Sequence, residues 1–148
     1  MKIFKAKSVF QILFWCSIIL PFKLVSQQFP PTYSGLTHYV NTHQIDSLGL
    51  RKLGSHFRTL DQNHADSLLS SVFPSLEAQY KNRPPHEKAF LYNRLTGATY
   101  QLTGNLQKSM EFADKQIKYY HQANNLFYEL WASVHKMTLL ADLDSVNM

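Results

Sequence analysis

The amino-acid sequence predicts an all-α protein made of antiparallel helical hairpins that stack on one another. Three observations lead to this prediction. Apolar residues recur at helical spacing from Ile45 to the end of the chain. Glycine, proline and asparagine interrupt that pattern at intervals that suit short turns between helices. No segment alternates polar residues with β-branched apolar ones, as a half-buried strand would.

The first 26 residues of the 148-residue chain have the pattern of a secretory signal peptide, which would form a signal helix ahead of the domain. Three lysines precede the apolar run 9–20, which Pro21 closes, and Ser26 suits the last position before cleavage. The run is shorter than the roughly 20 residues of a membrane span, and Gln11 interrupts it. We therefore expect export to the periplasm or the outer surface. Membrane contact is expected only through this segment, if it stays uncleaved.

The charge and the cysteine content argue against nucleic-acid binding and against thiol chemistry, respectively. The formal charge is +5, but four of the 15 basic residues lie in the signal segment, which leaves 11 basic against 10 acidic residues, or +1. The basic footprint of a nucleic-acid-binding protein is therefore missing. The single cysteine, Cys16, also lies in that segment. Disulfides and a catalytic thiol are thus excluded from the remaining chain.

The segment after the signal peptide divides into a lead-in and a helical region. Residues 27–44 are predicted to form an extended lead-in, because their first part is rich in proline and glycine. The first two helices of the region 45–148 are expected at about 45–60 and 65–80. Pro74 falls inside the second helix and should kink or split it, because proline lacks an N–H group and collides with the preceding turn.

The clearest turn signals bracket a helical hairpin at 86–121. Pro84 and Pro85 suit the first turn of its first helix. That helix should stop at Gly104, and Asn105 should cap the second helix by accepting a hydrogen bond from a free backbone N–H. The local sequence therefore predicts where the turn begins and where it ends.

A last helix is predicted after a break at 122–125, with an apolar side that consists of Phe127, Leu130, Trp131, Val134, Met137 and Leu140. Asp142 and Asp144 are expected at its junction with a following helix. Aromatic residues gather around the break. Core packing is the simpler explanation for them, and the alternative is that some line a peptide groove. The aromatic residues are Tyr119, Tyr120, Phe127, Tyr128 and Trp131.

The hairpin resembles a tetratricopeptide repeat (TPR). Gly97 stands where the family has a small residue that lets two helices approach, Tyr100 where an aromatic residue fills the seam, and Gly104 at the turn. The other matching positions, in order, are Leu106, Ser109, Met110 and Phe112. The resemblance implies a short α-solenoid with repeats at about 45–82 and 86–121 and a truncated one at 124–148.

The resemblance also implies a function. The first helix of each TPR hairpin faces a concave groove, so the resemblance places Arg94, Gln101, Tyr128 and His135 toward a partner. Exported repeats of this kind resemble the sensor portions of histidine kinases and helix-turn-helix regulators of Bacteroidetes-type bacteria. We expect a non-enzymatic module that binds another protein or peptide, as the sensor or scaffold part of a longer signalling protein of which this chain is a fragment. The alternative is a stand-alone periplasmic helical bundle that binds a small ligand or peptide.

No catalytic residue, metal site or cofactor is predicted. Seven histidines invite a metal interpretation, but His38 and His43 are five residues apart and do not share a helical face. The chain has neither the HExxH spacing of a zinc site nor a glycine-rich phosphate loop. The histidines therefore suit surface or capping positions.

Overall fold

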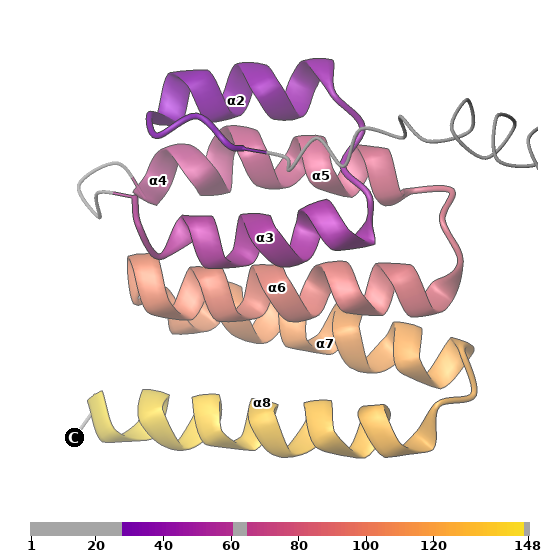
Figure 1. Ribbon diagram of the computed structural model, residues 1–148. Helices are drawn as coiled ribbons and strands as arrows, with labels where there is room; N and C mark the ends of the chain where they lie inside the picture. The colour runs from indigo at the N-terminus through magenta and orange to yellow at the C-terminus, as the bar shows by residue number, and fades with distance from the viewer. Residues whose placement is uncertain (1–27, 61–64, 147–148) are drawn as a thin grey trace, which may run out of the picture.

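The computed structural model describes residues 28–60 and 65–146, and in these ranges it contains helices and no strand. This confirms the predicted all-α class, whereas the predicted signal peptide at 1–26 lies outside the described residues. Figure 1 shows the helices side by side, with α2 at one end of the stack and α8 at the other. The elements are α2 (Tyr33–Thr42), α3 (Ser47–Phe57), α4 (Ala65–Ser67), a π-helical turn η2 (Leu68–Val72), α5 (Phe73–Tyr80), α6 (Pro85–Thr103), α7 (Leu106–Gln122) and α8 (Leu126–Val146).

The predicted extended lead-in at 27–44 is wrong for most of its length, because α2 occupies Tyr33–Thr42. Thr32 caps this helix by accepting a hydrogen bond from the N–H of Gly35 at 3.2 Å. A Cβ atom on Gly35 would come within 2.8 Å of the Pro30 side chain, so the glycine lets the proline-rich lead-in fold back onto the helix. Leu36 and Val40 are fully buried and join the core. The burial of two apolar residues and the N-terminal cap thus stabilise a helix here, although the surrounding sequence is rich in turn-forming residues.

Pro74 disturbs its helix as predicted, and the disturbance takes the form of a π-helical turn. The segment begins as α4, widens at η2 and continues as α5, whose first turn contains Pro74. Wider turns of this kind accommodate a residue that breaks the regular hydrogen-bond pattern. Within the segment the Ser70 hydroxyl donates to the carbonyl of Asp66 at 3.0 Å, and Ser71 donates to the carbonyl of Ser67. These serines supply hydrogen bonds where the helix changes its pitch.

The hairpin of α6 and α7 has the ends that its turn signals predict. Pro85 is the first residue of α6. Gly104 follows the helix with φ of 62°, a left-handed conformation that glycine adopts without strain. Asn105 then caps α7 by accepting a hydrogen bond from the N–H of Lys108 at 2.8 Å. The two helices run antiparallel and make the most extensive helix–helix contact among the described residues.

The large apolar core lies where α2, α3, α5, α6 and α7 meet. Phe112 of α7 is nearly fully buried, and its ring contacts the rings of Phe73 and Tyr92 with centroids 5.9 and 6.0 Å apart. The Tyr92 hydroxyl donates to Glu77 at 2.8 Å, and the Lys115 ammonium group pairs with the same carboxylate at 2.7 Å. One carboxylate therefore joins α5, α6 and α7 at the edge of the core.

The structure corrects the roles expected for two of the repeat residues. A Cβ atom on Gly97 would meet no atom within 4 Å, so the helices do not approach closely there. Tyr100 is 40% exposed and does not fill a closed seam. Its hydroxyl donates instead to the Asp142 carboxylate at 2.9 Å. In contrast, Met110 and Phe112 are buried, and Leu106 packs partly buried beside Met110.

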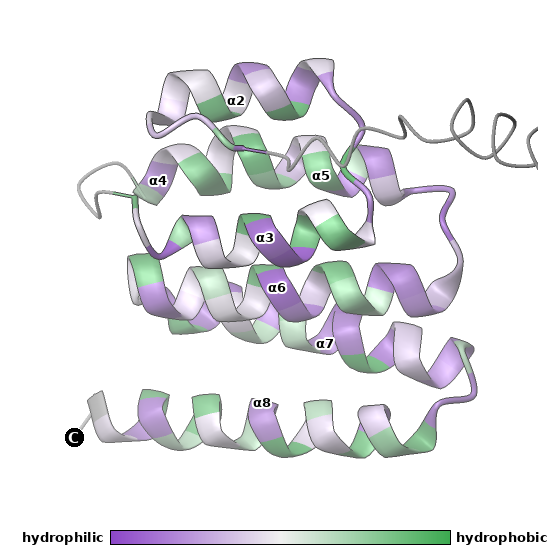
Figure 2. Cartoon of the chain, viewed as in Figure 1, coloured by the Kyte–Doolittle hydropathy of each residue, from purple (hydrophilic) through white to green (hydrophobic). Residues whose placement is uncertain are grey.

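The helix α8 differs from the prediction in length and in the side that it buries. It continues without a break through Asp142, so this residue is not at a helix junction. Its buried contacts are made by Ala132, which packs with Ala89 and Tyr120, and by Leu139, which packs with Met110 and Ala113. The large apolar residues of the predicted apolar side are exposed instead. Figure 2 shows hydrophobic residues, coloured green, at intervals along the ribbon of this end helix. None of the described helices combines the length and hydropathy needed to cross a membrane.

Candidate functional site

A groove of about 860 Å³ runs across α3, α6 and α8. These helices alternate with α4–α5 and α7 along the chain. Three structural elements far apart in the sequence therefore share one surface. The residues that line it are Ser47, Leu48, Arg51, His86, Glu87, Phe90, Asn93, Arg94, Tyr120, Asn125, Phe127, Tyr128 and Trp131.

Arg94 is the central cation of the groove. Its guanidinium group lies over the ring of Phe90 one helical turn earlier, with the Cζ atom 4.8 Å from the ring centroid. The Nε atom is buried and has no hydrogen-bond partner among the described residues. Burial lowers the pKa of Arg94, and the nearby charges of Arg51 and Arg58 lower it further. The guanidinium group is thus half-buried, and its covered Nε–H leaves a hydrogen bond unmade among the described residues.

Gly54 lies next to the Arg94 side chain and limits where that side chain can lie. A Cβ atom on Gly54 of α3 would come within 3.2 Å of Arg94 Cδ. The glycine therefore leaves room for the arginine stem to cross from α6 over α3. Glu87, the carboxylate in the groove, is paired with Arg83 at 3.7 Å. The groove consequently has an excess of positive charge from Arg51 and Arg94.

Aromatic residues from α7 and α8 form one wall of the groove. The rings of Tyr120 and Tyr128 stack with centroids 5.4 Å apart, and Phe127 contacts Tyr128 edge-on at 5.3 Å. Phe127 is 73% exposed, and Tyr128 and Trp131 are about half exposed. Burial raises the pKa of Tyr120, so its hydroxyl remains a neutral donor at physiological pH. The wall offers a large apolar surface at low cost in side-chain entropy.

The structure brings together two of the four residues that the TPR resemblance places in a groove. Arg94 and Tyr128 line it. Gln101 does not, because it lies further along α6 and accepts a hydrogen bond from Arg58 at 3.2 Å. His135 also lies outside the lining, with its ring centroid 5.7 Å from that of Trp131 and its buried Nδ1 atom without a hydrogen-bond partner in the described part of the chain.

Sequence reasoning missed the contributions of Arg51 and Phe90. Phe90 is four residues before Arg94, a spacing that places both on one face of a helix, so this pair could have been found. Nothing in the local sequence of α3 points to Arg51. Phe127 and Trp131 belong to the aromatic cluster for which a groove was the alternative to core packing, and their exposure favours the groove.

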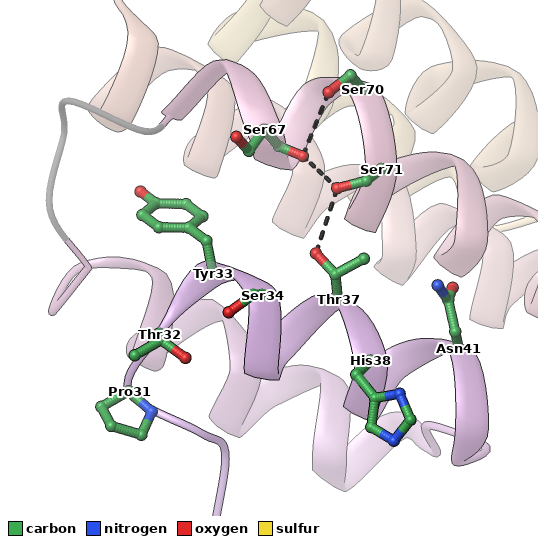
Figure 3. Close-up of a pocket in the computed structure, with 10 residues that line it drawn as sticks. All are labelled: Pro31, Thr32, Tyr33, Ser34, Thr37, His38, Asn41, Ser67, Ser70 and Ser71. Carbon is green, nitrogen blue, oxygen red and sulfur yellow. Dashed lines mark hydrogen bonds between the residues drawn. The ribbon is translucent and has the colours of Figure 1, made fainter.

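A second hollow of about 840 Å³ lies between α2 and the η2 turn. Figure 3 shows hydroxyl side chains facing one another across it, and Thr37 Oγ1 lies 3.3 Å from Ser71 Oγ. Most of these hydroxyls are occupied by bonds within the protein, and no Lys, Arg, Asp or Glu side chain lines the hollow. It therefore provides fewer groups that could bind a ligand than the groove does.

The described residues include no group of three or more histidine, cysteine, aspartate or glutamate side chains placed to hold a metal ion. No protein-family profile, curated protein or solved structure matches the chain. The groove geometry is therefore the main basis for a functional assignment.

Proposed function

We propose that this chain is a non-enzymatic, TPR-like helical module that binds a peptide segment of another protein in the groove across α3, α6 and α8. The observation that supports this most strongly is Arg94, whose buried Nε–H has no acceptor among the described residues and whose cation lies within an aromatic groove. Arginine and aromatic side chains in such positions are typical anchors of peptide and protein binding.

The order of the helices supports the solenoid arrangement within this proposal. Helix α6 contacts α3 on one side and α7 on another, and α7 in turn contacts α8. Successive hairpins placed in this way present their first helices on a common surface, as in TPR arrays. The signal-peptide pattern of residues 1–26 supports a place outside the cytoplasm, as the sensor or scaffold part of a longer signalling protein.

The chemistry of the groove indicates the kind of peptide. A carboxylate can accept hydrogen bonds from Arg94 and lie near Arg51, where it would offset the charge repulsion between the two. An apolar or aromatic side chain can lie on the wall of Phe127 and Trp131. We therefore expect short segments that combine an acidic residue with an aromatic one.

Selection from a random peptide library on the wild-type chain tests the proposal. Enriched peptides are then measured by fluorescence anisotropy against Arg94→Met and against Arg58→Met. The second variant is a matched control, because it makes the same change at an exposed arginine outside the groove lining. We expect enrichment of acidic and aromatic residues. Arg94→Met should weaken binding about 10-fold or more, since a charge-assisted pair is worth roughly 1.5–3 kcal/mol. Equal binding to both variants, or no enrichment, would refute the proposal.

A further inference from the structure

The side of α7 that packs against α8 has a polar residue at its centre. Ala113 shares a small apolar cluster with Leu139 of α8. Two turns further along α7, Tyr120 shares another with Ala132 of α8. Gln116 lies between Ala113 and Tyr120 at steps of three and four residues, which places all three on one helical face. Because Gln116 has no exposed surface, a long polar side chain is enclosed in an otherwise apolar interface.

Helix α8 brings a second polar residue to the same level. His135 lies between Ala132 and Leu139, again at steps of three and four residues. Because α7 and α8 run antiparallel, Gln116 and His135 both lie about midway between the two apolar contacts. The Nδ1 atom of His135 is buried and has no hydrogen-bond partner in the part of the chain that the structure describes. The middle of the α7–α8 interface is therefore polar on both sides.

The Gln116 amide is buried without hydrogen bonds. Neither its oxygen nor its nitrogen atom has a partner among the described residues. Burial raises the pKa of Tyr120, and the Gln116 amide offsets part of that rise, so the two groups are close without reaching hydrogen-bond geometry. A primary amide has two donor hydrogens and an oxygen with two lone pairs, so contact with one hydroxyl leaves most of them unused. Such a group is more stable in water than inside a protein, and its burial therefore opposes the docking of α8.

The other contacts of α8 near this level offset the penalty only in part. Lys136 pairs with Asp114, whose side chain is more than half exposed. Exposed ion pairs stabilise proteins little, because water screens the charges. The large apolar cluster that joins α6 to α7 through Tyr92 and Phe112 contains no residue of α8. The unpaired amide therefore acts on a helix that has few buried contacts to hold it in place.

We infer that α8 undocks from α7 as a unit while α2 to α7 stay folded, and that the unpaired Gln116 amide promotes this opening. Undocking lets water form hydrogen bonds with Gln116 and His135, and it exposes only the two small apolar clusters beside them. Helix α8 also carries Phe127, Tyr128 and Trp131 of the groove lining, so its position sets the shape of the groove. The movement itself does not depend on what the groove binds.

Hydrogen–deuterium exchange of the full chain, measured at the amides of residues 132–139, tests the inference. These residues lie in the middle of α8, away from the helix ends, which fray in any protein. Gln116→Met removes the amide with little other change, because methionine is unbranched and has nearly the helix propensity of glutamine. Gln107→Met is the matched control, since it makes the same substitution at an exposed position of α7.

In the wild type we expect residues 132–139 to exchange ahead of residues 91–98 in the middle of α6. Gln116→Met should slow exchange at 132–139 about 10-fold, because the penalty for burying an unpaired amide disappears. Gln107→Met should change it less than about 2-fold. Exchange at 132–139 no earlier than at 91–98 overturns the inference, as does exchange in Gln116→Met no slower than in Gln107→Met. No peptide enters this measurement, so either failure leaves the proposed peptide binding to its own test.

Discussion

The carboxylate of Glu77 offers a sharp test of how the hairpin is fastened to the core. Its Oε1 atom accepts from the Tyr92 hydroxyl at 2.8 Å and pairs with the Lys115 ammonium group at 2.7 Å. Replacing Tyr92 by phenylalanine removes one hydroxyl and leaves the ring in its stack with Tyr119, whose centroid is 5.5 Å away. The change therefore isolates a single charge-assisted hydrogen bond.

The expected loss follows from the surroundings of that bond. A hydrogen bond to a charged group contributes about 1.5–3 kcal/mol. Glu77 keeps Lys115 as a partner and is 28% exposed, so the lower end of that range applies. We expect Tyr92→Phe to lower the free energy of unfolding by about 1.5 kcal/mol, or to shift the urea midpoint by roughly 1 M for a slope of 1–2 kcal/mol/M.

Urea unfolding followed by circular dichroism measures this loss. Tyr119→Phe is the matched control, because it removes the hydroxyl from the ring stacked on Tyr92 without breaking any of the hydrogen bonds described for Glu77. The control should lie within about 0.5 kcal/mol of the wild type. A Tyr92→Phe protein as stable as the wild type, or a control equally destabilised, would refute the reasoning.

Two further predictions concern pH and the glycines. Burial, with Glu87 nearby, raises the pKa of Tyr80 to about 12, and burial together with Glu77 raises the pKa of Tyr92. Because the neutral phenols are favoured in the folded state, their stabilisation is complete below the unfolded pKa of about 10 and should decline above it, with the Tyr80 contribution lost as pH rises from 10 through about 12, measured as a falling urea midpoint. Gly104→Ala should destabilise by about 1–2 kcal/mol, because its φ is 62°. Gly97→Ala should stabilise by about 0.5–1 kcal/mol, because its Cβ meets no atom within 4 Å, and equal melting shifts for the two would contradict this contrast.

The turns around α6 and α7 were predictable because their causes are local. Proline at a first helical turn, glycine in a left-handed conformation and an asparagine cap each act within a few residues. Helix α2 was missed for the opposite reason. Its stability comes from Leu36 and Val40 packing on segments distant in sequence, while its neighbourhood of prolines suggests an extended chain.

The orientation of α8 could not be predicted, because the helix is apolar on two sides. Ala132 and Leu139 face the protein, and Leu130, Val134 and Met137 face away from it. Periodicity detects a stripe but does not choose between two of them, and hydrophobic size favours the side that is in fact exposed. The groove residues were predicted only in part for a related reason. Arg94 and Tyr128 were identified from their positions in the repeat pattern, whereas the place of Arg51 in the groove depends on how α3 packs against α6.

The uneven distribution of buried contacts has a consequence for the groove. Helices α2 to α7 share one large apolar cluster, whereas α8 is held by the small clusters around Ala132 and Leu139 and by a few exposed polar contacts. We therefore expect α8 to detach in local unfolding at a lower free energy than unfolding of the whole chain needs. Each detachment removes the aromatic wall of the groove. The observed affinity for a peptide is then the intrinsic affinity multiplied by the fraction of molecules with α8 in place, and anything that clamps α8 strengthens binding without touching the peptide.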